Sequence, residues 1–198
     1  MNTVFRISLL ALLLGLGACG STPRSDYFRL SGSTPDNTGN EPSIGIGPVE
    51  IPKYLQRNGM VYNQGEHQLQ IASYQRWAEP LAEGITRVLG LNLSAALNTQ
   101  NTRPFPWPPS DRPRYAVQVW LLSLDTSANS SQLAAEWRLY SPAQQREVTR
   151  RISRYQGPGS AFDGAQLAAS YSQLLNQLSD DIAQAINEDM AQQSIFEQ

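Results

Sequence analysis

LAASYSQLLNQLSDDIAQAI, residues 167–186, has the most regular apolar spacing in the chain. Its apolar side chains recur at helical intervals, at Leu167, Tyr171, Leu174, Leu175, Leu178, Ile182, Ala185 and Ile186. In an α-helix with about 3.6 residues per turn, this spacing gathers them on one face. The pattern therefore predicts a long amphipathic helix over residues 162–190, packed through one face against another layer.

A second helix is predicted upstream, because Glu79-Pro80 suits a helix start and apolar residues follow at helical spacing from Leu81 to Leu97. Alternating apolar and polar residues, bounded by turn residues, predict strands elsewhere. These strands cover residues 27–30, 43–49, 60–63, 68–72, 115–121, 133–140 and 145–155. The order of strands, helix, strands and helix predicts a two-layer α/β (α+β) domain: a mostly antiparallel sheet with two long helices packed on one face.

Two features of residues 43–49 stand out. Gly45 and Gly47 alternate, so one face of this strand has no side chains there and something must approach the backbone closely. Pro48 and Pro52 lack a backbone N–H, which predicts that the strand lies at an edge or ends there.

The N-terminus has the layout of a secretory signal peptide that ends in a bacterial lipobox. Arg6 precedes an apolar run from Ile7 to Leu16, and small residues lead to Cys19, the only cysteine. A transmembrane helix needs about 20 apolar residues, which this run lacks. An ordinary signal peptide cut elsewhere is the other alternative, and a disulfide has no second cysteine. We therefore expect a signal peptide over residues 1–18 and a lipid-modified Cys19.

At a lipobox the cysteine thiol receives diacylglycerol and the new amino terminus an acyl chain such as palmitate, so no other cofactor is expected. By resemblance to enterobacterial lipoproteins, Gly20 in place of Asp favours sorting to the outer membrane. Residues 19–42 are rich in Ser, Thr, Pro, Gly and Asn, which predicts a flexible tether containing a first short strand. Residues 43–198 then form a single periplasmic domain.

Composition argues against several functions. The formal net charge is −2 and only one of the 15 cationic side chains is a lysine, so no basic field for nucleic acid exists. The single histidine, His67, falls in the predicted hairpin loop, and neither a nucleophile elbow nor a set of zinc ligands is present. The acidic pairs Asp180-Asp181 and Glu188-Asp189 are expected on a solvated helix face. The sequence predicts that the protein is not an enzyme and holds no metal.

Three blocks carry a family resemblance. They are GPVEIPKYLQRNGMV at residues 47–61, WAEPL at 77–81 with RVL at 87–89 and NL at 92–93, and the strand pair YAVQV at 115–119 and LAAEW at 133–137. In this order they resemble the PqiC (YmbA-like) family of ABC-type transport auxiliary lipoproteins, over about residues 26–190. Gln56 and Asn58-Gly59 depart from the family, which often has an acidic residue and a proline there.

The resemblance implies an outer-membrane lipoprotein that faces the periplasm and supports envelope integrity. Its implied partner is a membrane-anchored MCE-domain protein whose tube carries lipids between the membranes, and a homo-oligomeric ring around the tube end is left open. The resemblance implies no catalytic residues and no nucleic-acid partner. A structural lipoprotein that scaffolds envelope proteins or peptidoglycan without handling lipid is the alternative.

The candidate partner surface is the segment from Pro52 to Asn58. Its Pro52, Tyr54, Leu55 and Arg57 suit an exposed edge that offers aromatic and guanidinium contacts. Alternatively, Tyr54 and Leu55 cap the core. Trp107, in the proline-rich segment 103–109, is either a docking or membrane-interface contact or a cover for one end of the sheet.

Overall fold

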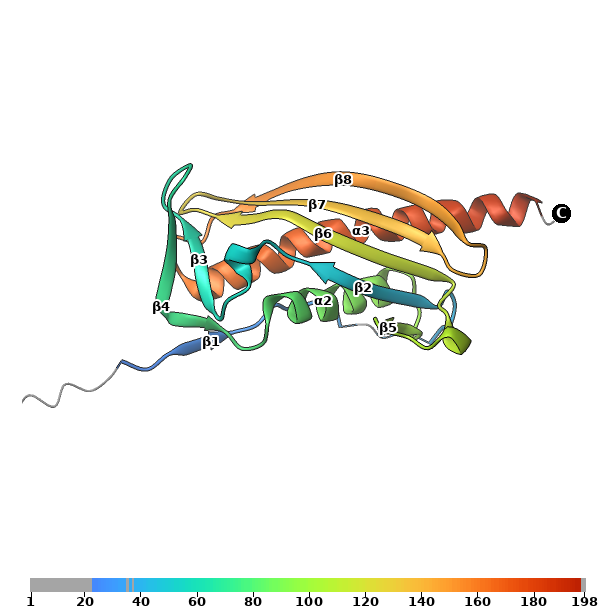
Figure 1. Ribbon diagram of the computed structural model, residues 1–198, viewed down its shortest axis with the longest axis horizontal. Helices are drawn as coiled ribbons and strands as arrows, with labels where there is room; N and C mark the ends of the chain where they lie inside the picture. Colours follow the sequence, from blue (N-terminus) through green and yellow to red (C-terminus); the bar gives the residue numbers. More distant parts are fainter. Residues whose placement is uncertain (1–22, 35, 37, 197–198) are drawn as a thin grey trace, which may run out of the picture.

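The computed structural model describes residues 23–34, 36 and 38–196 (Figure 1). The signal peptide at residues 1–18 and Cys19 lie outside the described residues. In chain order the elements are β1 (Asp26–Phe28), β2 (Ile44–Glu50), the 3₁₀ turn η1 (Lys53–Leu55), β3 (Gly59–Asn63), β4 (Leu69–Trp77), α2 (Leu81–Ala96), β5 (Thr102–Pro104), the 3₁₀ turn η2 (Pro109–Asp111), β6 (Tyr115–Thr126), β7 (Ser130–Ser141), β8 (Arg146–Pro158) and α3 (Gly164–Phe196). The α+β class with two helices is confirmed.

The strands form two sheets. Five strands pair in the order β5-β2-β6-β7-β8, and three pair in the order β1-β4-β3. The long β6, β7 and β8 are antiparallel neighbours, whereas β2 runs parallel to both β5 and β6, and β1 runs parallel to β4. A parallel pair needs a long connection, and the chain between β2 and β6 includes α2.

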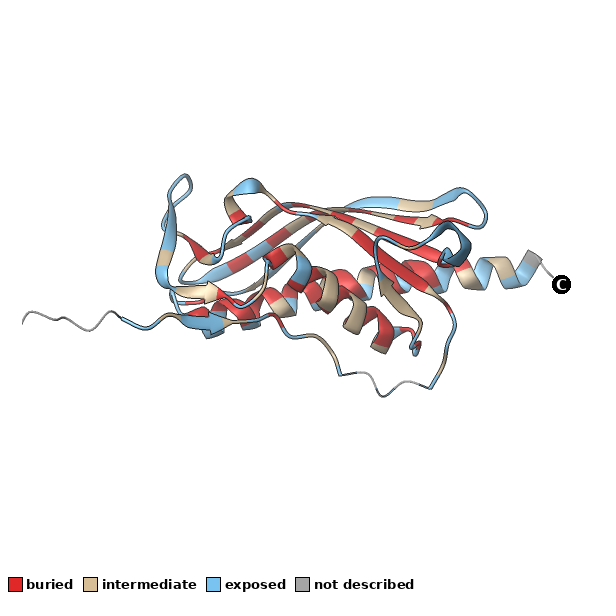
Figure 2. Ribbon diagram, turned by 60° about the horizontal axis from the view of Figure 1, so that its bottom comes forward, coloured by how far each residue is buried: buried red, intermediate tan, exposed pale blue. Residues whose placement is uncertain are grey.

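Both helices lie on one side of the five-stranded sheet (Figure 2). The apolar face of α3 is fully buried at Leu174, Leu178 and Ile182, each 0% exposed. It packs on inward side chains of the sheet such as Trp137 and Leu139, also 0% exposed. Asp163 Oδ1 accepts a hydrogen bond from the Gln166 backbone N–H at 2.9 Å, which caps the start of α3.

Over Ile44–Ile46 the strand β2 lies inside the sheet and not at an edge, whereas its end at Glu50, before Pro52, agrees with the other expectation from its prolines. Its residues from Ile44 to Ile46 pair with β5 on one side and β6 on the other. Pro48 is tolerated because it falls at the register shift between Ile46 and Val49, where the ladder with β6 is interrupted. The sequence missed β5, the three-residue edge strand, because prolines surround it.

The predicted close approach to the glycine face of β2 is confirmed. A methyl group added at Gly45 would lie 2.6 Å from a ring carbon of Trp107 and 2.6 Å from Pro113. Such contacts are far inside van der Waals distance, so any side chain at Gly45 would displace the Trp107 ring.

Part of the expected tether packs on the helices. Leu30 is 1% exposed, and the Ser31 backbone N–H donates to Ser172 Oγ of α3 at 3.0 Å. The Ser33 backbone N–H donates to Asn92 Oδ1 of α2 at 2.8 Å. Residues 30–33 are therefore held across both helices by a buried side chain and by hydrogen bonds between their backbone and side chains of α2 and α3.

The acidic residue Asp189 is not solvated as expected for its helix face. It is 5% exposed, and its carboxylate accepts hydrogen bonds from the Tyr115 hydroxyl at 2.8 Å and from Arg146 Nη2 at 2.7 Å. Because Tyr115 begins β6 and Arg146 begins β8, the Asp189 carboxylate links the C-terminal part of α3 to the five-stranded sheet by hydrogen bonds.

Candidate functional site

The segment at η1 contains residues that pack into the protein and residues that are exposed to solvent. Leu55 is 3% exposed and belongs to the core, so it is unavailable to a partner. The half-buried Tyr54 donates a hydrogen bond from its hydroxyl to Asp125 Oδ1 at 2.9 Å. Lys53, Gln56 and Arg57 are exposed, and the ion pairs found among the described residues include neither of these two cations. The η1 segment (residues 52–57) is thus a rigid turn with a cationic outer side.

Burial, together with the negative charge of Asp125, raises the pKa of Tyr54 from 10.0 to about 12. The unfolded chain loses this proton near pH 10 while the folded chain keeps it. The stability that Tyr54 contributes is therefore complete below pH 10 and is lost as the pH rises from 10 to about 12.

Tyr54→Phe is expected to cost about 1 kcal/mol at pH 8, because the hydrogen bond to Asp125 is lost. Between pH 8 and pH 11 the variant should lose less stability than the natural protein. Urea unfolding at the two pH values measures both effects. Equal losses for the two proteins would contradict the raised pKa of Tyr54.

Trp107 lies far from η1. Its ring packs on Gly45 of β2 and meets Phe105 edge-to-face with ring centroids 5.1 Å apart, so it covers one end of the sheet. Gly45 pairs with Ala116 near the start of β6, whereas Tyr54 bonds Asp125 near the end of that strand. At about 3.3 Å per residue, nine residues of strand separate the two by roughly 30 Å. The structure therefore does not bring the sequence-predicted partner residues into one site.

A groove of about 440 Å³, which the sequence patterns did not predict, lies between α2 and the β5 edge. Ile46 forms its floor, with Glu83, Thr86, Arg87, Gly90 and Leu91 of α2 on one wall and residues 102–105 on the other. Its volume falls within the range of small-ligand sites, about 300–1,000 Å³. Gly90 within a predicted helix was the available sign of close approach, since a methyl group there would meet Ile46 Cδ1 at 3.3 Å.

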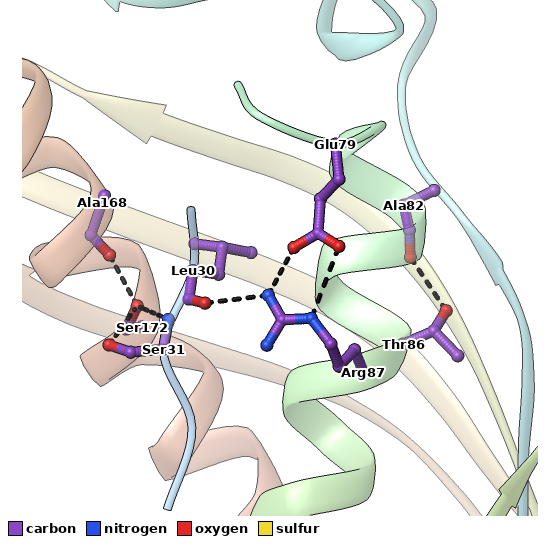
Figure 3. Close-up of polar contacts among 8 residues, drawn as sticks. All are labelled: Leu30, Ser31, Glu79, Ala82, Thr86, Arg87, Ala168 and Ser172. Atoms are coloured by element: carbon purple, nitrogen blue, oxygen red, sulfur yellow. Dashed lines mark hydrogen bonds and ion pairs between the residues drawn. The ribbon is translucent and has the colours of Figure 1, made fainter. Parts of the chain in front are cut away.

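Two polar side chains on the α2 wall of this groove, Arg87 and Thr86, make hydrogen bonds within the protein (Figure 3). Arg87 forms an ion pair with Glu79 and donates from Nη2 to the Leu30 carbonyl oxygen at 2.9 Å. Thr86 Oγ1 donates back to the Ala82 carbonyl oxygen at 2.8 Å. Arg87 thus joins the start of α2 to the N-terminal segment, so its role is structural and it adds no reactive group to the groove.

No metal-binding group of side chains is found in the part of the chain that the structure describes. Within residues 23–34, 36 and 38–196, no three His, Cys, Asp or Glu side chains are grouped closely enough to hold a metal ion. His67 is exposed in the β3–β4 loop. No helix among these residues has both the length and the apolar character required to span a membrane.

Comparisons with known proteins agree with this architecture. An uncharacterized protein of known crystal structure matches with a TM-score of 0.67 and 22% identity, over 83% of this chain and 99% of its own. The protein XCC0632 from Xanthomonas campestris, of family model DUF330, matches with a TM-score of 0.68 and 14% identity, over 85% of this chain and 99% of its own. At these identities the likeness establishes the fold alone. No curated protein matches this chain.

The sequence itself gives the family. Residues 29–183 match the family described as "ABC-type transport auxiliary lipoprotein component", a match that begins just after β1, runs into α3 and includes α2 and every strand from β2 to β8. This agrees with the resemblance carried by the blocks at residues 47–61, 77–93 and 115–137. The chain belongs to the ABC-type transport auxiliary lipoprotein family.

Proposed function

We propose that the protein is the outer-membrane lipoprotein subunit of an MCE-type intermembrane lipid transport system. In this role it docks a periplasmic, MCE-domain conduit and supports envelope integrity. The observation that carries the proposal is the family match over residues 29–183, which describes an auxiliary component of ABC-type transport. An auxiliary component acts by binding, so no reaction has to be assigned to the chain.

The lipobox at Cys19 supports the membrane side of this role. Each buried methylene of an acyl chain contributes about 0.8 kcal/mol, and several chains on one protein make release from a bilayer slow. Together with Gly20, this favours a protein held at the periplasmic face of the outer membrane. The anchored domain would then meet a partner that reaches across the periplasm.

The η1 segment supports the docking side. Leu55 in the core and the Tyr54–Asp125 hydrogen bond hold the turn in place before any partner arrives. Preorganisation of this kind lowers the entropy cost of binding. Its exposed Lys53 and Arg57 suit an acidic or carbonyl-rich surface on the conduit, and Arg is enriched where interfaces gain most of their energy.

Co-purification tests the proposal. The tagged protein, with its native Cys19 anchor, is isolated from detergent-solubilised membranes and its partners are identified by mass spectrometry. We expect an MCE-domain protein to be recovered. Arg57→Ala should reduce that recovery about tenfold, as loss of an interface arginine commonly does. Arg154→Ala, an exposed arginine on β8, is the matched control and should leave recovery unchanged.

A thermal melt accompanies each variant, so that loss of the partner is separated from loss of the fold. Recovery of peptidoglycan-associated or other envelope proteins, with no MCE-domain protein, would contradict the proposal and favour a structural scaffold. If Arg57→Ala leaves the recovery of the MCE-domain protein unchanged, the proposed partner stands, but its docking surface lies elsewhere than at η1.

A further inference from the structure

A second pocket, of about 280 Å³, is lined by outward-facing residues of β6 and β7. The two helices lie on the opposite side of the five-stranded sheet (Figure 2). The floor of the pocket is formed by Ala116, Gln118, Arg138 and Tyr140, which alternate with the buried residues of β6 and β7 and so point away from α2 and α3. Trp107 and Arg112 close one side, and Pro142 and Gln145 close the other. The pocket therefore joins the β5–β6 connection to the β7–β8 turn.

Two arginines and no carboxylate line this pocket. Arg138 forms a long ion pair with Glu147, whose Oε2 lies 3.7 Å from Nη1, so no direct hydrogen bond joins the two side chains. Arg112 is exposed and takes no part in the ion pairs seen among the described residues. Arg112 therefore brings positive charge that no acidic side chain in the lining balances, and the counter-charge of Arg138 comes from Glu147, which lies outside the lining.

Arg138 also has hydrogen-bonding capacity that the protein leaves unused. Its Nε is buried and makes no hydrogen bond, and among the described residues only Ser131 Oγ shares that condition. A buried donor without a partner destabilises a fold, so such groups are rare and call for an explanation. A ligand oxygen that accepts a hydrogen bond from the Arg138 guanidinium would supply the partner that Nε lacks.

The aromatic walls hold this charge in a fixed position. The Arg138 guanidinium carbon lies 5.2 Å from the centre of the Tyr140 ring, within the range of a cation–π contact. Trp107 is fixed by Gly45 beneath it and by Phe105 at its edge. Gln145 has a φ of 52°, the left-handed region that a glutamine seldom adopts, so the turn that closes the pocket is strained.

We propose that this pocket binds a phosphate ester. Two guanidinium groups from different elements can share the oxygens of a tetrahedral phosphate, which offers more acceptor oxygens and more negative charge than a carboxylate does. The aromatic rings, Ala116 and Pro142 would contact the carbon atoms next to the phosphate. The volume suits a headgroup or small phosphate ester, and a conduit can dock at η1 without it, so this site goes beyond the proposed function.

The test is a titration of the full acylated protein in dodecyl maltoside micelles, followed through the indole N–H resonance of Trp107. Trp107→Phe identifies that resonance. The probes are glycerol 3-phosphate, inorganic phosphate, and micelles doped with either phosphatidylglycerol or diacylglycerol, which lacks the phosphate. We expect a saturable shift with the phosphate esters and none with diacylglycerol. A response to phosphatidylglycerol alone identifies a lipid headgroup, and a response to glycerol 3-phosphate as well identifies a general phosphate-ester site.

Arginine variants connect the shift to the pocket. Arg112→Ala and Arg138→Lys should each weaken binding about tenfold, the first by removing a charge and the second by removing the planar fork. Arg112 is exposed, so its variant should remain folded, and Arg154→Ala on the same face of the sheet is the control. Absence of a saturable shift with every phosphate probe would overturn the proposal, as would an affinity in both pocket variants equal to that of the natural protein.

Discussion

Cys19→Ser is expected to move the protein from the membrane fraction to the soluble periplasmic fraction almost completely. A serine hydroxyl cannot accept the thioether-linked diacylglycerol, and without that modification the chain keeps no acyl anchor. Several acyl chains give stable membrane attachment, whereas even one myristoyl chain gives only marginal attachment. Fractionation after an alkaline wash, with immunodetection of the tagged protein, measures the redistribution.

The structure supplies the control for this variant. Cys19 lies outside the described residues, and the buried apolar core is formed by side chains from Leu30 to Ile186, so the serine variant should melt at the natural temperature. Mass spectrometry of the natural protein should also show the added acyl mass on the peptide that begins at Cys19. A serine variant that stays in the washed membrane would contradict lipid anchoring at this residue.

Trp137→Ala is expected to lower the free energy of unfolding by about 3–5 kcal/mol, the range measured for large aromatic residues removed from protein cores. Trp137 is 0% exposed and sits in β7, the strand between β6 and β8. Its indole Nε1–H donates to Ser153 Oγ at 3.0 Å. The alanine variant loses this hydrogen bond and leaves a cavity beneath α3. Urea unfolding followed by circular dichroism measures the change.

Two further tryptophan variants separate the causes. Trp137→Phe keeps most of the buried apolar volume and loses the hydrogen bond, so about 1–2 kcal/mol is expected. Trp120→Ala, on the outer face of β6 where the ring is only partly buried, should cost much less than Trp137→Ala. Similar losses for Trp120→Ala and Trp137→Ala would contradict the assignment of the core to the helix-covered face.

The helices and most strands could be predicted because their residues interact with near neighbours in the sequence. The apolar spacing predicted a helix over residues 162–190, and α3 runs over Gly164–Phe196. The helix expected from Leu81 to Leu97 ends one residue earlier, at Ala96. Alternation likewise located β6, β7 and β8, although each extends beyond its predicted bounds.

The division into two sheets could not be predicted, because strand pairing depends on contacts between distant residues. Local patterns do not say that β1 joins β4 while β2 joins β5 and β6. The interior place of β2 was missed for a related reason. A proline is excluded from an interior strand only where its position would have to donate a hydrogen bond to the neighbouring strand. At Pro48 the register shift between Ile46 and Val49 interrupts the ladder with β6, so no such donor is required.

The candidate binding surfaces also depend on contacts between distant residues, so the sequence predicted them only in part. The composition of residues 52–57 drew attention to η1, but only the packing separates the buried Leu55 from the exposed Arg57. The phosphate pocket joins Arg112 and Arg138, which lie 26 residues apart, through strand pairing that no local pattern contains. The proline-rich surroundings of Trp107 marked it as a candidate contact residue, but its packing on Gly45 of β2 could not be predicted from the local sequence.

Docking of an MCE-domain conduit at η1 is tested most directly by photo-crosslinking in living cells. A photoreactive amino acid replaces the exposed Gln56 beside Arg57, and the exposed Gln184 on α3 is the control position. Irradiation followed by mass spectrometry identifies the crosslinked partner. We expect an MCE-domain protein to be crosslinked from position 56 and not from position 184. Crosslinks from position 56 only to peptidoglycan-associated proteins, or only to other copies of this chain, would contradict docking of an MCE-domain conduit at η1.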